Sequence, residues 1–221
     1  MARKCIVFDL DGTLVDSLPQ ITAALNVFLR VHGRRAVSKP DVRRMMGDGA
    51  LELVERCLAA TGHVPERDET AALAEAFLAL YRGFPVAACR PFDQVGETLA
   101  TLREAGCRLA VCTNKERATS IKVLHHVGLA PLFDVVVGGD STPHLKPHVA
   151  PLELALAQLD GAPETAIMVG DSGNDITMAQ ALNLPAVACL YGYPRDAVEL
   201  AGADHAITEF AQLLEVLNRV I

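Results

Sequence analysis

The amino-acid sequence predicts an α/β protein with a parallel sheet covered by helices on both faces and a purely helical segment inserted near its start. Short apolar, β-branched runs recur along the chain, and most are separated by residues of helical periodicity. Continuous apolar strands that alternate with helices are typical of parallel sheets buried on both faces. A long stretch between the first two runs carries helical signals alone, which predicts the insertion.

Six segments have the composition of buried strands. They are Cys5–Phe8, Arg108–Cys112, Val135–Val137, Ala166–Val169, Ala186–Cys189 and, more weakly, His205–Ile207. Between them, apolar residues recur at helical spacing, for example at Val95, Leu99 and Leu102. Binding sites in such sheets lie beyond the carboxyl ends of the strands, so polar residues that directly follow these segments are candidates for function.

The segment from Ser17 to about Phe84 predicts several helices in succession. Ser17 is a plausible N-cap with Pro19 just inside a first helix, and further helices are expected over residues 50–60 and 69–82. A crossover between parallel strands usually takes one helix. We therefore expect a helical cap domain of residues 16–86, inserted into a core made of residues 1–15 and 87–221.

Composition and charge restrict the partners and the compartment. The 221 residues are 51% apolar and carry a net charge of −7, which gives no electrostatic help in binding nucleic acid or an anionic membrane. No apolar run approaches membrane-spanning length, and no charged-then-apolar leader precedes the first strand. The six cysteines form no CxxC pair, and free thiols suit a reducing compartment, so we expect a cytoplasmic protein.

Polar signals gather where the predicted strands end. Asp9 and Asp11 follow the first strand, Thr-Asn-Lys at 113–115 follows the second, and Gly-Asp-Ser-Gly-Asn-Asp at 170–175 ends a later one. Lys146 lies in a loop between two of these strands. Because the carboxyl ends of parallel strands share one edge of the sheet, we expect these sites to converge.

The converging acids predict a bound cation. Several carboxylates in one place repel each other, and oxygen ligands without a Cys/His set favour Mg²⁺ over zinc. A hydroxyl, an amide and an ammonium suit the oxygens of a phosphate that the metal does not bind. Phosphoryl transfer depends mostly on positioning and charge neutralisation. A carboxylate can also act as the nucleophile in such a reaction.

Four motifs carry a resemblance to a known family. The stretches "DLDGTLVDS", "TNK", "LKP" and "GDSGND" stand in the order of the four motifs of the haloacid dehalogenase-like (HAD) phosphatases. The resemblance spans residues 9–175, and the whole chain is similar to this superfamily. It implies a Rossmann-like core, a helical cap after the first strand, and Mg²⁺-dependent hydrolysis of a phosphate ester.

The resemblance also implies roles for individual residues. Asp9 is expected to be the nucleophile, and Asp11 the acid that protonates the leaving group and then activates water. Thr113 and Asn114 are expected to hold the phosphoryl group, and Lys146 to neutralise it. The dehalogenases of the superfamily lack the second aspartate, so the presence of Asp11 favours a phosphatase.

The same resemblance implies the ligands of the metal. Asp9, the backbone carbonyl of Asp11 and Asp171 are expected to hold Mg²⁺, and Asp175 to support the metal's waters or orient Lys146. Alternatively, Asp175 is a first-turn acid stabilised by the helix dipole. Gly12 is expected to let the chain turn closely past the phosphate.

The closer resemblance is to bacterial phosphoglycolate phosphatases. The stretches "DLDGTLVDSLPQI", "VVVGGDSTPHLKP" and "MVGDSGNDI" are similar to that group, as is the cap stretch "MMGDGALELVERCL". One departure lies in the cap loop expected to face the substrate, where Gly47, Asp48 and Gly49 replace the usual Gly-Asn-Gly. The added negative charge is unfavourable for a carboxylated substrate unless another group offsets it.

These observations predict a Mg²⁺-dependent phosphatase that acts on a small phosphorylated metabolite as a monomer or homodimer, with 2-phosphoglycolate as the first candidate. The same chemistry on a sugar phosphate, a nucleotide or pyrophosphate is an alternative, as is a phosphomutase. A non-catalytic module that senses Mg²⁺ and phosphate is a third, although Asp11 and Lys146 argue against it.

Overall fold

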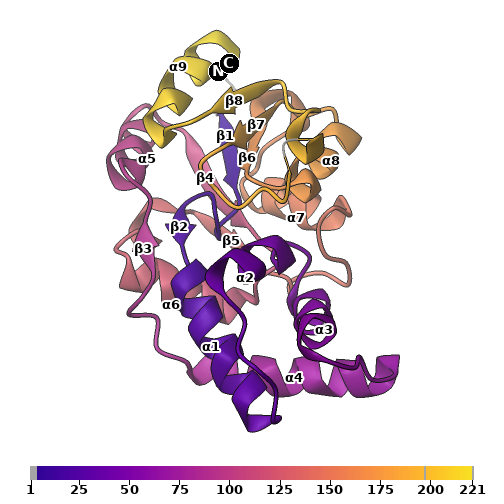
Figure 1. Ribbon diagram of the computed structural model, residues 1–221. Coiled ribbons are helices and arrows are strands. Elements are labelled where there is room, and N and C mark those ends of the chain that lie inside the picture. Colours follow the sequence, from indigo (N-terminus) through magenta and orange to yellow (C-terminus); the bar gives the residue numbers. More distant parts are fainter. Residues whose placement is uncertain (1–3, 197, 221) are drawn as a thin grey trace.

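A parallel sheet lies at the centre of the computed structural model, which describes residues 4–196 and 198–220 (Figure 1). Within these residues the sheet has six strands in the order β5-β4-β1-β6-β7-β8. The strands are β1 (Cys5–Phe8), β4 (Arg108–Cys112), β5 (Val135–Val137), β6 (Ala166–Gly170), β7 (Ala186–Cys189) and β8 (His205–Ile207). The predicted fold class and strand segments are confirmed, with β6 one residue longer than expected.

Helices cover both faces of the sheet. Strand β1 shows the division, because Ile6 and Phe8 belong to one apolar cluster and Cys5 and Val7 to the other. The first face packs against α5 (Val95–Glu104), α6 (Arg117–His126) and α9 (Leu213–Val220), and the second against α7 (Ala150–Gln158) and α8 (Gly173–Ala181). Short 3₁₀ turns occur at Ala130–Leu132, Pro163–Thr165, Val198–Leu200 and Phe210–Gln212.

Of the helices between β1 and β4, the four that precede α5 form a unit that we call the helical insert. They are α1 (Leu18–Val31), α2 (Lys39–Met45), α3 (Ala50–Thr61) and α4 (Arg67–Gly83). The insert has an apolar cluster of its own, in which the rings of Phe28 and Phe77 lie 5.7 Å apart. A separate cluster indicates that the insert folds around its own core and not around the sheet.

Two short strands connect the insert to the sheet. β2 (Val15–Asp16) pairs antiparallel with β3 (Arg90–Pro91), so the chain enters and leaves the insert side by side. The hydroxyl of Tyr193 donates to Asp16 and accepts from the amide of Leu18, which fixes the entry to α1. The insert lies beyond the carboxyl ends of the large sheet, and both termini lie at the opposite end (Figure 1).

Helix α2 was not predicted from the sequence. Its start is marked by a capping box, in which Ser38 and Asp41 satisfy each other's backbone amides, and Pro40 lies in the first turn. The pattern Ser-x-x-Asp with a proline between was therefore a usable signal. Helix α1 begins after Ser17 as expected, although the buried Ser17 hydroxyl makes no capping hydrogen bond.

The cysteines and the helix lengths can be compared with the sequence predictions. All six cysteines are buried, and those at positions 57, 89, 107, 112 and 189 form no disulfide, in agreement with the sequence prediction. None of the helices in the described ranges is both long and apolar enough to cross a membrane.

Candidate active site

Three strand ends bring the predicted catalytic groups together. The amide of Asp9, directly after β1, donates to the carbonyl of Val169 in β6 at 2.9 Å. The amide of Thr113, directly after β4, donates to the carbonyl of Val137 in β5 at 3.0 Å. Asp171 follows β6, the other neighbour of β1. All three residues therefore leave the sheet at the same edge, because backbone hydrogen bonds between the parallel strands extend to their carboxyl ends.

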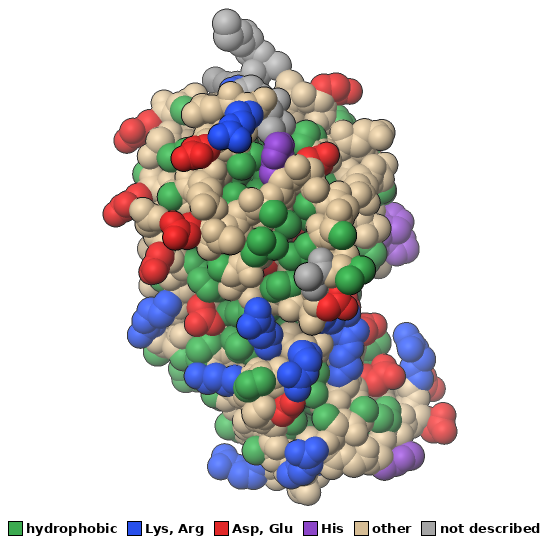
Figure 2. All heavy atoms as spheres, turned by 45° about the horizontal axis from the view of Figure 1, so that its top comes forward, with side chains coloured by type: hydrophobic (Ala, Val, Ile, Leu, Met, Phe, Trp, Pro, Cys, Tyr) green, Lys and Arg blue, Asp and Glu red, His purple; other side chains and the backbone are tan. Residues whose placement is uncertain are grey.

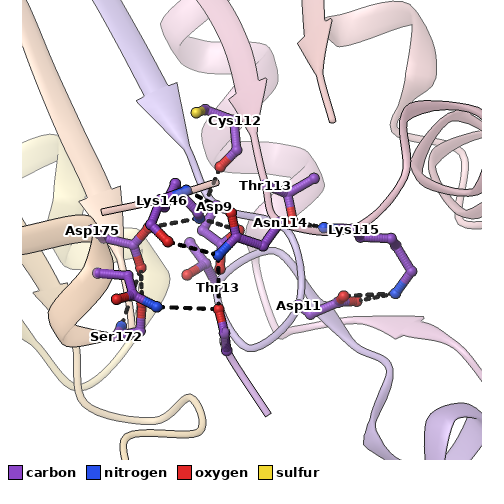
Figure 3. Close-up of polar contacts among 12 residues, drawn as sticks. Asp9, Asp11, Thr13, Cys112, Thr113, Asn114, Lys115, Lys146, Ser172 and Asp175 are labelled. Carbon is purple, nitrogen blue, oxygen red and sulfur yellow. Dashed lines mark hydrogen bonds and ion pairs between the residues drawn. The ribbon is translucent and has the colours of Figure 1, made fainter. Parts of the chain in front are cut away.

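Lys146 lies at the centre of this group (Figure 3). Its Nζ atom is 2.8 Å from Asp9 Oδ1 and 2.7 Å from Asp175 Oδ1, and it donates to the carbonyl of Cys112 at 3.0 Å. The ammonium is almost completely buried. Burial alone would lower the pKa of Lys146, but the charges of Asp175 and Asp9 raise it above its usual value. The lysine therefore stays charged.

Asn114 holds the backbone of Lys146 in place. Its Oδ1 accepts from the Lys146 amide at 2.8 Å, and its Nδ2 donates to the Lys146 carbonyl at 3.1 Å. The same Nδ2 donates to the carbonyl of Gly47 in the helical insert at 3.0 Å. Asn114, which is expected to hold the phosphoryl group, thus uses its side chain to orient the lysine and to meet the insert.

Asp171 is held by the turn after β1 and by a distant loop. Its Oδ1 accepts from the Thr13 hydroxyl at 3.0 Å, and its Oδ2 accepts from the Tyr193 amide at 2.6 Å. Gly12 has a φ of 92°, and a Cβ atom at this position would collide with the Asp171 carboxylate. Only glycine fits here, so the predicted close turn at Gly12 is formed against an acid of the site.

Asp175 is buried and serves two partners. Its Oδ2 accepts from the amide of Ser172 at 3.1 Å and from its hydroxyl at 2.7 Å, which caps the start of α8. Its Oδ1 faces Lys146. A Cβ atom at Gly170 would collide with the Asp175 carboxylate, so glycine at the end of β6 makes room for it. Both contacts predicted as alternatives for Asp175, with Lys146 and with the helix start, are present.

The acidic cluster has the composition of a metal site. Asp9, Asp171 and Asp175 each offer an oxygen within 4.8 Å of the others, and one lysine faces them. Burial raises the pKa of Asp9 to about 6 against the pull of Lys146, and burial with the charges of Asp9 and Asp175 raises that of Asp171. Asp9 Oδ1 is buried without a well-formed hydrogen bond. A bound cation would satisfy this oxygen and favour the charged carboxylates, so the residues fit a metal ion.

Asp11 lies outside the acidic cluster. Both oxygens of its carboxylate accept from Lys115 Nζ, at 2.8 and 2.6 Å, and the pair stands apart from Asp9 and Lys146 (Figure 3). The same ammonium lies 5.3 Å from the ring centroid of Tyr81 in α4. The side chains of Asp9 and Asp11 thus point to different partners, although one residue separates them in sequence.

The loop of Gly47, Asp48 and Gly49 contacts the core at the same edge. The carbonyl of Gly47 accepts from Asn114 and from Asn174. Asp48 pairs with Arg56 of α3, with Arg195 at 2.8 Å, and with Asn174 at 2.6 Å. Figure 2 shows lysine and arginine side chains gathered near the junction of the helical insert and the core.

These contacts settle how the extra charge of Asp48 is accommodated. Burial would raise the pKa of Asp48, but hydrogen bonds from Asn174, Arg56 and Arg195 lower it below its usual value. Two guanidinium groups thus more than offset the carboxylate. Asp48 joins the insert to the core and is not an unpaired charge above the site.

A chamber of about 570 Å³ lies between the insert and the core. Its floor includes Asp9, Asp11, Thr113 and Lys146. Its wall on the insert side is largely apolar and includes Ile21, Met46, Leu53, Ala74, Phe77, Leu78 and Tyr81. The site is therefore a covered pocket in which a ligand would touch both parts of the molecule.

Several residues of the site were not predicted from sequence. Thr13 stands inside the first motif and Lys115 belongs to the Thr-Asn-Lys signal after the second strand, but the sequence predicted no partner for either side chain. Arg195 and Tyr193 lie in the loop after β7, far along the chain from their partners Asp48 and Asp171. No local pattern identifies such partners.

Comparison with known proteins gives the family. The model of the haloacid dehalogenase-like hydrolases matches residues 3–183. The chain is 39% identical over 205 residues to the phosphoglycolate phosphatase of Caulobacter vibrioides, covering 93% of this chain and 86% of that one. It is 41% identical to the phosphoglycolate phosphatase of Rhodospirillum rubrum over 215 residues, or 95% and 89% of the two chains.

A solved structure agrees with these matches. The crystal structure of a predicted phosphoglycolate phosphatase from Haemophilus somnus superimposes with a TM-score of 0.88 at 32% identity, covering 97% of this chain and 98% of that one. The chain therefore belongs to the haloacid dehalogenase-like hydrolases. Within that family it is a phosphatase enzyme similar to phosphoglycolate phosphatases.

Proposed function

We propose that this phosphatase hydrolyses 2-phosphoglycolate to glycolate and phosphate, with Mg²⁺ and through a phosphorylated Asp9. The observation that carries the chemistry is the buried cluster of three carboxylates, two of which, those of Asp9 and Asp175, pair with Lys146. The substrate is supported by the names of the relatives that match nearly the whole chain. The fully buried thiols and the acidic charge agree with a cytoplasmic enzyme.

Asp9, Asp171, the backbone carbonyl of Asp11 and, directly or through water, Asp175 would hold the Mg²⁺ ion. When bound, the ion would supply positive charge to the carboxylates and to the phosphoryl oxygens. Oxygen ligands alone, with no cysteine or histidine in the cluster, favour Mg²⁺ over a softer metal.

In the first step, an oxygen of Asp9 attacks the phosphorus atom and the bond between phosphorus and the leaving oxygen breaks. Asp11, which first takes a proton from solvent when it leaves Lys115, gives that proton to the leaving oxygen, so glycolate leaves as an alcohol. In the second step, Asp11 takes a proton from water, the water oxygen attacks phosphorus, and the bond to Asp9 breaks. Phosphate is released and both aspartates return to their starting states.

Other residues position and neutralise the phosphoryl group. The buried ammonium of Lys146, already within 2.8 Å of Asp9, offsets its negative charge. Thr113 and Asn114 contact its oxygens, and Gly12 allows the chain to pass close to it. Because these groups serve the phosphoryl group, the rest of the chamber lining, on the insert side and at Lys115, would select the substrate.

We propose that residues 16–86 act as a cap domain. The loop of Gly47, Asp48 and Gly49 meets Asn114 and Asn174 at the edge of the chamber, which supports a closed state that excludes water. Opening of the cap would break these contacts and release product.

A larger phosphate monoester is the second candidate. A chamber of about 570 Å³ with a largely apolar wall offers more room than a two-carbon leaving group needs. This observation favours a substrate with a longer or partly apolar leaving group, processed by the same two steps.

A phosphate-release assay distinguishes the candidates. The purified protein, with Mg²⁺, is given 2-phosphoglycolate, sugar phosphates, nucleotides and pyrophosphate, and kcat/KM is compared. We expect 2-phosphoglycolate to rank first by at least about tenfold, which corresponds to about 1.4 kcal/mol of transition-state binding. A larger ester in first place would refute the proposed substrate while leaving the phosphatase chemistry intact. Formation of an isomeric ester without free phosphate would identify a mutase.

A further inference from the structure

We propose that Lys115 is the residue that recognises the substrate's carboxylate, and that it does so by exchanging the carboxylate of Asp11 for that of the substrate. The inference rests on the proposed function and extends it, because it assigns a specificity residue and links substrate choice to the release of Asp11. The class of substrate is a phosphate monoester with a carboxylate a few bonds from the phosphorus atom.

The position of Lys115 is suited to this role. It follows Thr113 and Asn114 at the end of β4, and it lines the same chamber as Asp9 and Lys146. Its side chain is only 6% exposed, so its charge interacts strongly with whatever lies beside it. A small substrate whose phosphoryl group lies at Asp9 and whose other end extends along the chamber floor toward Asp11 would bring that end to this ammonium.

The other cations of the chamber already have fixed partners. Among the residues that the structure describes, the lysine and arginine side chains lining the chamber are those of Lys115, Lys146 and Arg195. Lys146 uses its ammonium on Asp9, Asp175 and a backbone carbonyl. Arg195 pairs with Asp48 and lies near Glu199. Lys115 alone is paired with a group that the reaction itself must release.

The pairing of Asp11 with Lys115 cannot persist through the reaction. Both Asp11 oxygens accept hydrogen bonds from the ammonium, at 2.8 and 2.6 Å, so neither is directed to a leaving oxygen above Asp9. If Asp11 simply left, Lys115 would remain as an unpaired, nearly buried charge, which is costly. A substrate carboxylate has the same charge and the same two acceptor oxygens, so it can replace Asp11 without this cost. A neutral group cannot.

The helical insert holds the ammonium while its partner changes. Tyr81 of α4 presents its ring to Lys115 Nζ at 5.3 Å, and its hydroxyl donates to Gln20 of α1 at 2.6 Å. Both Tyr81 and Gln20 are buried, so they form a firm wall on the insert side. The insert thus contributes to recognition of the carboxylate through Lys115 and without a cation of its own.

The test compares two substrates that differ at one end. Initial rates are measured with 2-phosphoglycolate and with 2-hydroxyethyl phosphate, which carries an alcohol in place of the carboxylate. The proteins are the wild type, Lys115→Met, Lys115→Arg and, as a matched control, Lys39→Met on the exposed start of α2. A thermal melt in the presence of Mg²⁺ establishes that each variant is folded.

We expect Lys115→Met to lower the ratio of kcat/KM for 2-phosphoglycolate over 2-hydroxyethyl phosphate by about 10- to 100-fold, mainly through KM for 2-phosphoglycolate. Lys115→Arg should restore part of the ratio, and Lys39→Met should leave it unchanged. If Lys115→Met lowers activity on both substrates by the same factor, Lys115 only supports the fold or Asp11, and the inference is wrong. Wild-type protein that does not hydrolyse 2-phosphoglycolate would instead refute the proposed function, and the exchange with it.

Discussion

Negative charge is balanced differently in the acidic cluster of the core and at Asp48 of the helical insert. In the core, three carboxylates are buried together, and the ammonium of Lys146 pairs with two of them, those of Asp9 and Asp175. In the insert, the one carboxylate of Asp48 faces two guanidinium groups and the amide of Asn174. The acidic cluster has fewer positive charges than carboxylates, whereas Asp48 has two positive charges for one carboxylate.

This difference separates a reactive site from a structural contact. Buried carboxylates with too little positive charge destabilise the folded protein. A bound cation, together with the phosphoryl group that it holds, would offset this destabilisation. The Asp48 pairs need no further ligand, because they are complete within the chain. We therefore expect changes in the core cluster to affect catalysis, and changes at Asp48 to affect mainly how the insert meets the core.

The largest effect is expected from Asp9→Asn. The substitution keeps the shape of the side chain and removes the nucleophile, so phosphate release should fall by at least about 10³-fold in kcat. Because one of three repelling charges is lost, the melting temperature of the metal-free protein should not fall. Release of phosphate from p-nitrophenyl phosphate with Mg²⁺ measures the first effect. Activity at the wild-type rate would show that Asp9 is not the nucleophile.

The next effect concerns Mg²⁺ and pH. Burial raises the pKa of Asp9 from 3.8 to about 6 when no metal is present, and that of Asp171 is also raised. At these two carboxylates the folded protein then binds more protons than the unfolded chain, so their contribution to stability falls as pH rises from about 4 to about 6 and stays low above that range. Mg²⁺ favours the charged carboxylates and removes this loss.

Melting curves at two pH values test this prediction. The increase in melting temperature on adding Mg²⁺ should be larger at about pH 7.5 than at about pH 5, by a few degrees for a chain of this size. The variant Asp171→Asn should lose most of the increase at the higher pH. An increase of equal size at both pH values would mean that the carboxylates of the cluster do not bind the ion.

The smallest effect is expected from Asp48→Asn. Its ion pairs are about one-third exposed on the arginine side, and such pairs contribute about 0.2–1 kcal/mol each. We expect kcat/KM for 2-phosphoglycolate to change by less than about tenfold and the free energy of unfolding by about 1 kcal/mol or less. The exposed Asp68→Asn of the same insert is the control. A strong rise in turnover with Asp48→Asn would instead make Asp48 a determinant of specificity.

The core site was largely predictable because sheet geometry constrains it. Once Cys5–Phe8 and Ala166–Val169 are interpreted as parallel strands, Asp9 and Asp171 must leave the same edge. The capping box at Ser38 and Asp41 is an equally local signal, and it marks the start of α2. Fold class, strand segments and the set of converging acids follow from patterns of this kind.

The contacts of the insert were not predictable in the same way. One partner of Asp48 is Arg195, 147 positions away, and it reaches Asp48 only because the insert docks on the loop after β7. The bond between Lys115 and Asp11 depends on side-chain directions at two strand ends, which residue spacing does not determine. Such contacts come from how two units with separate apolar cores are placed against each other.

The central claim, that Asp9 carries the phosphoryl group, can be tested by trapping the intermediate. Asp11→Asn, which should slow hydrolysis of the phosphorylated enzyme, is mixed with 2-phosphoglycolate and Mg²⁺ and then quenched with borohydride, which reduces an acyl phosphate to an alcohol. Peptide mass spectrometry should find homoserine in place of Asp9. Homoserine at another aspartate, or none while the wild type releases phosphate under the same conditions, would contradict the account.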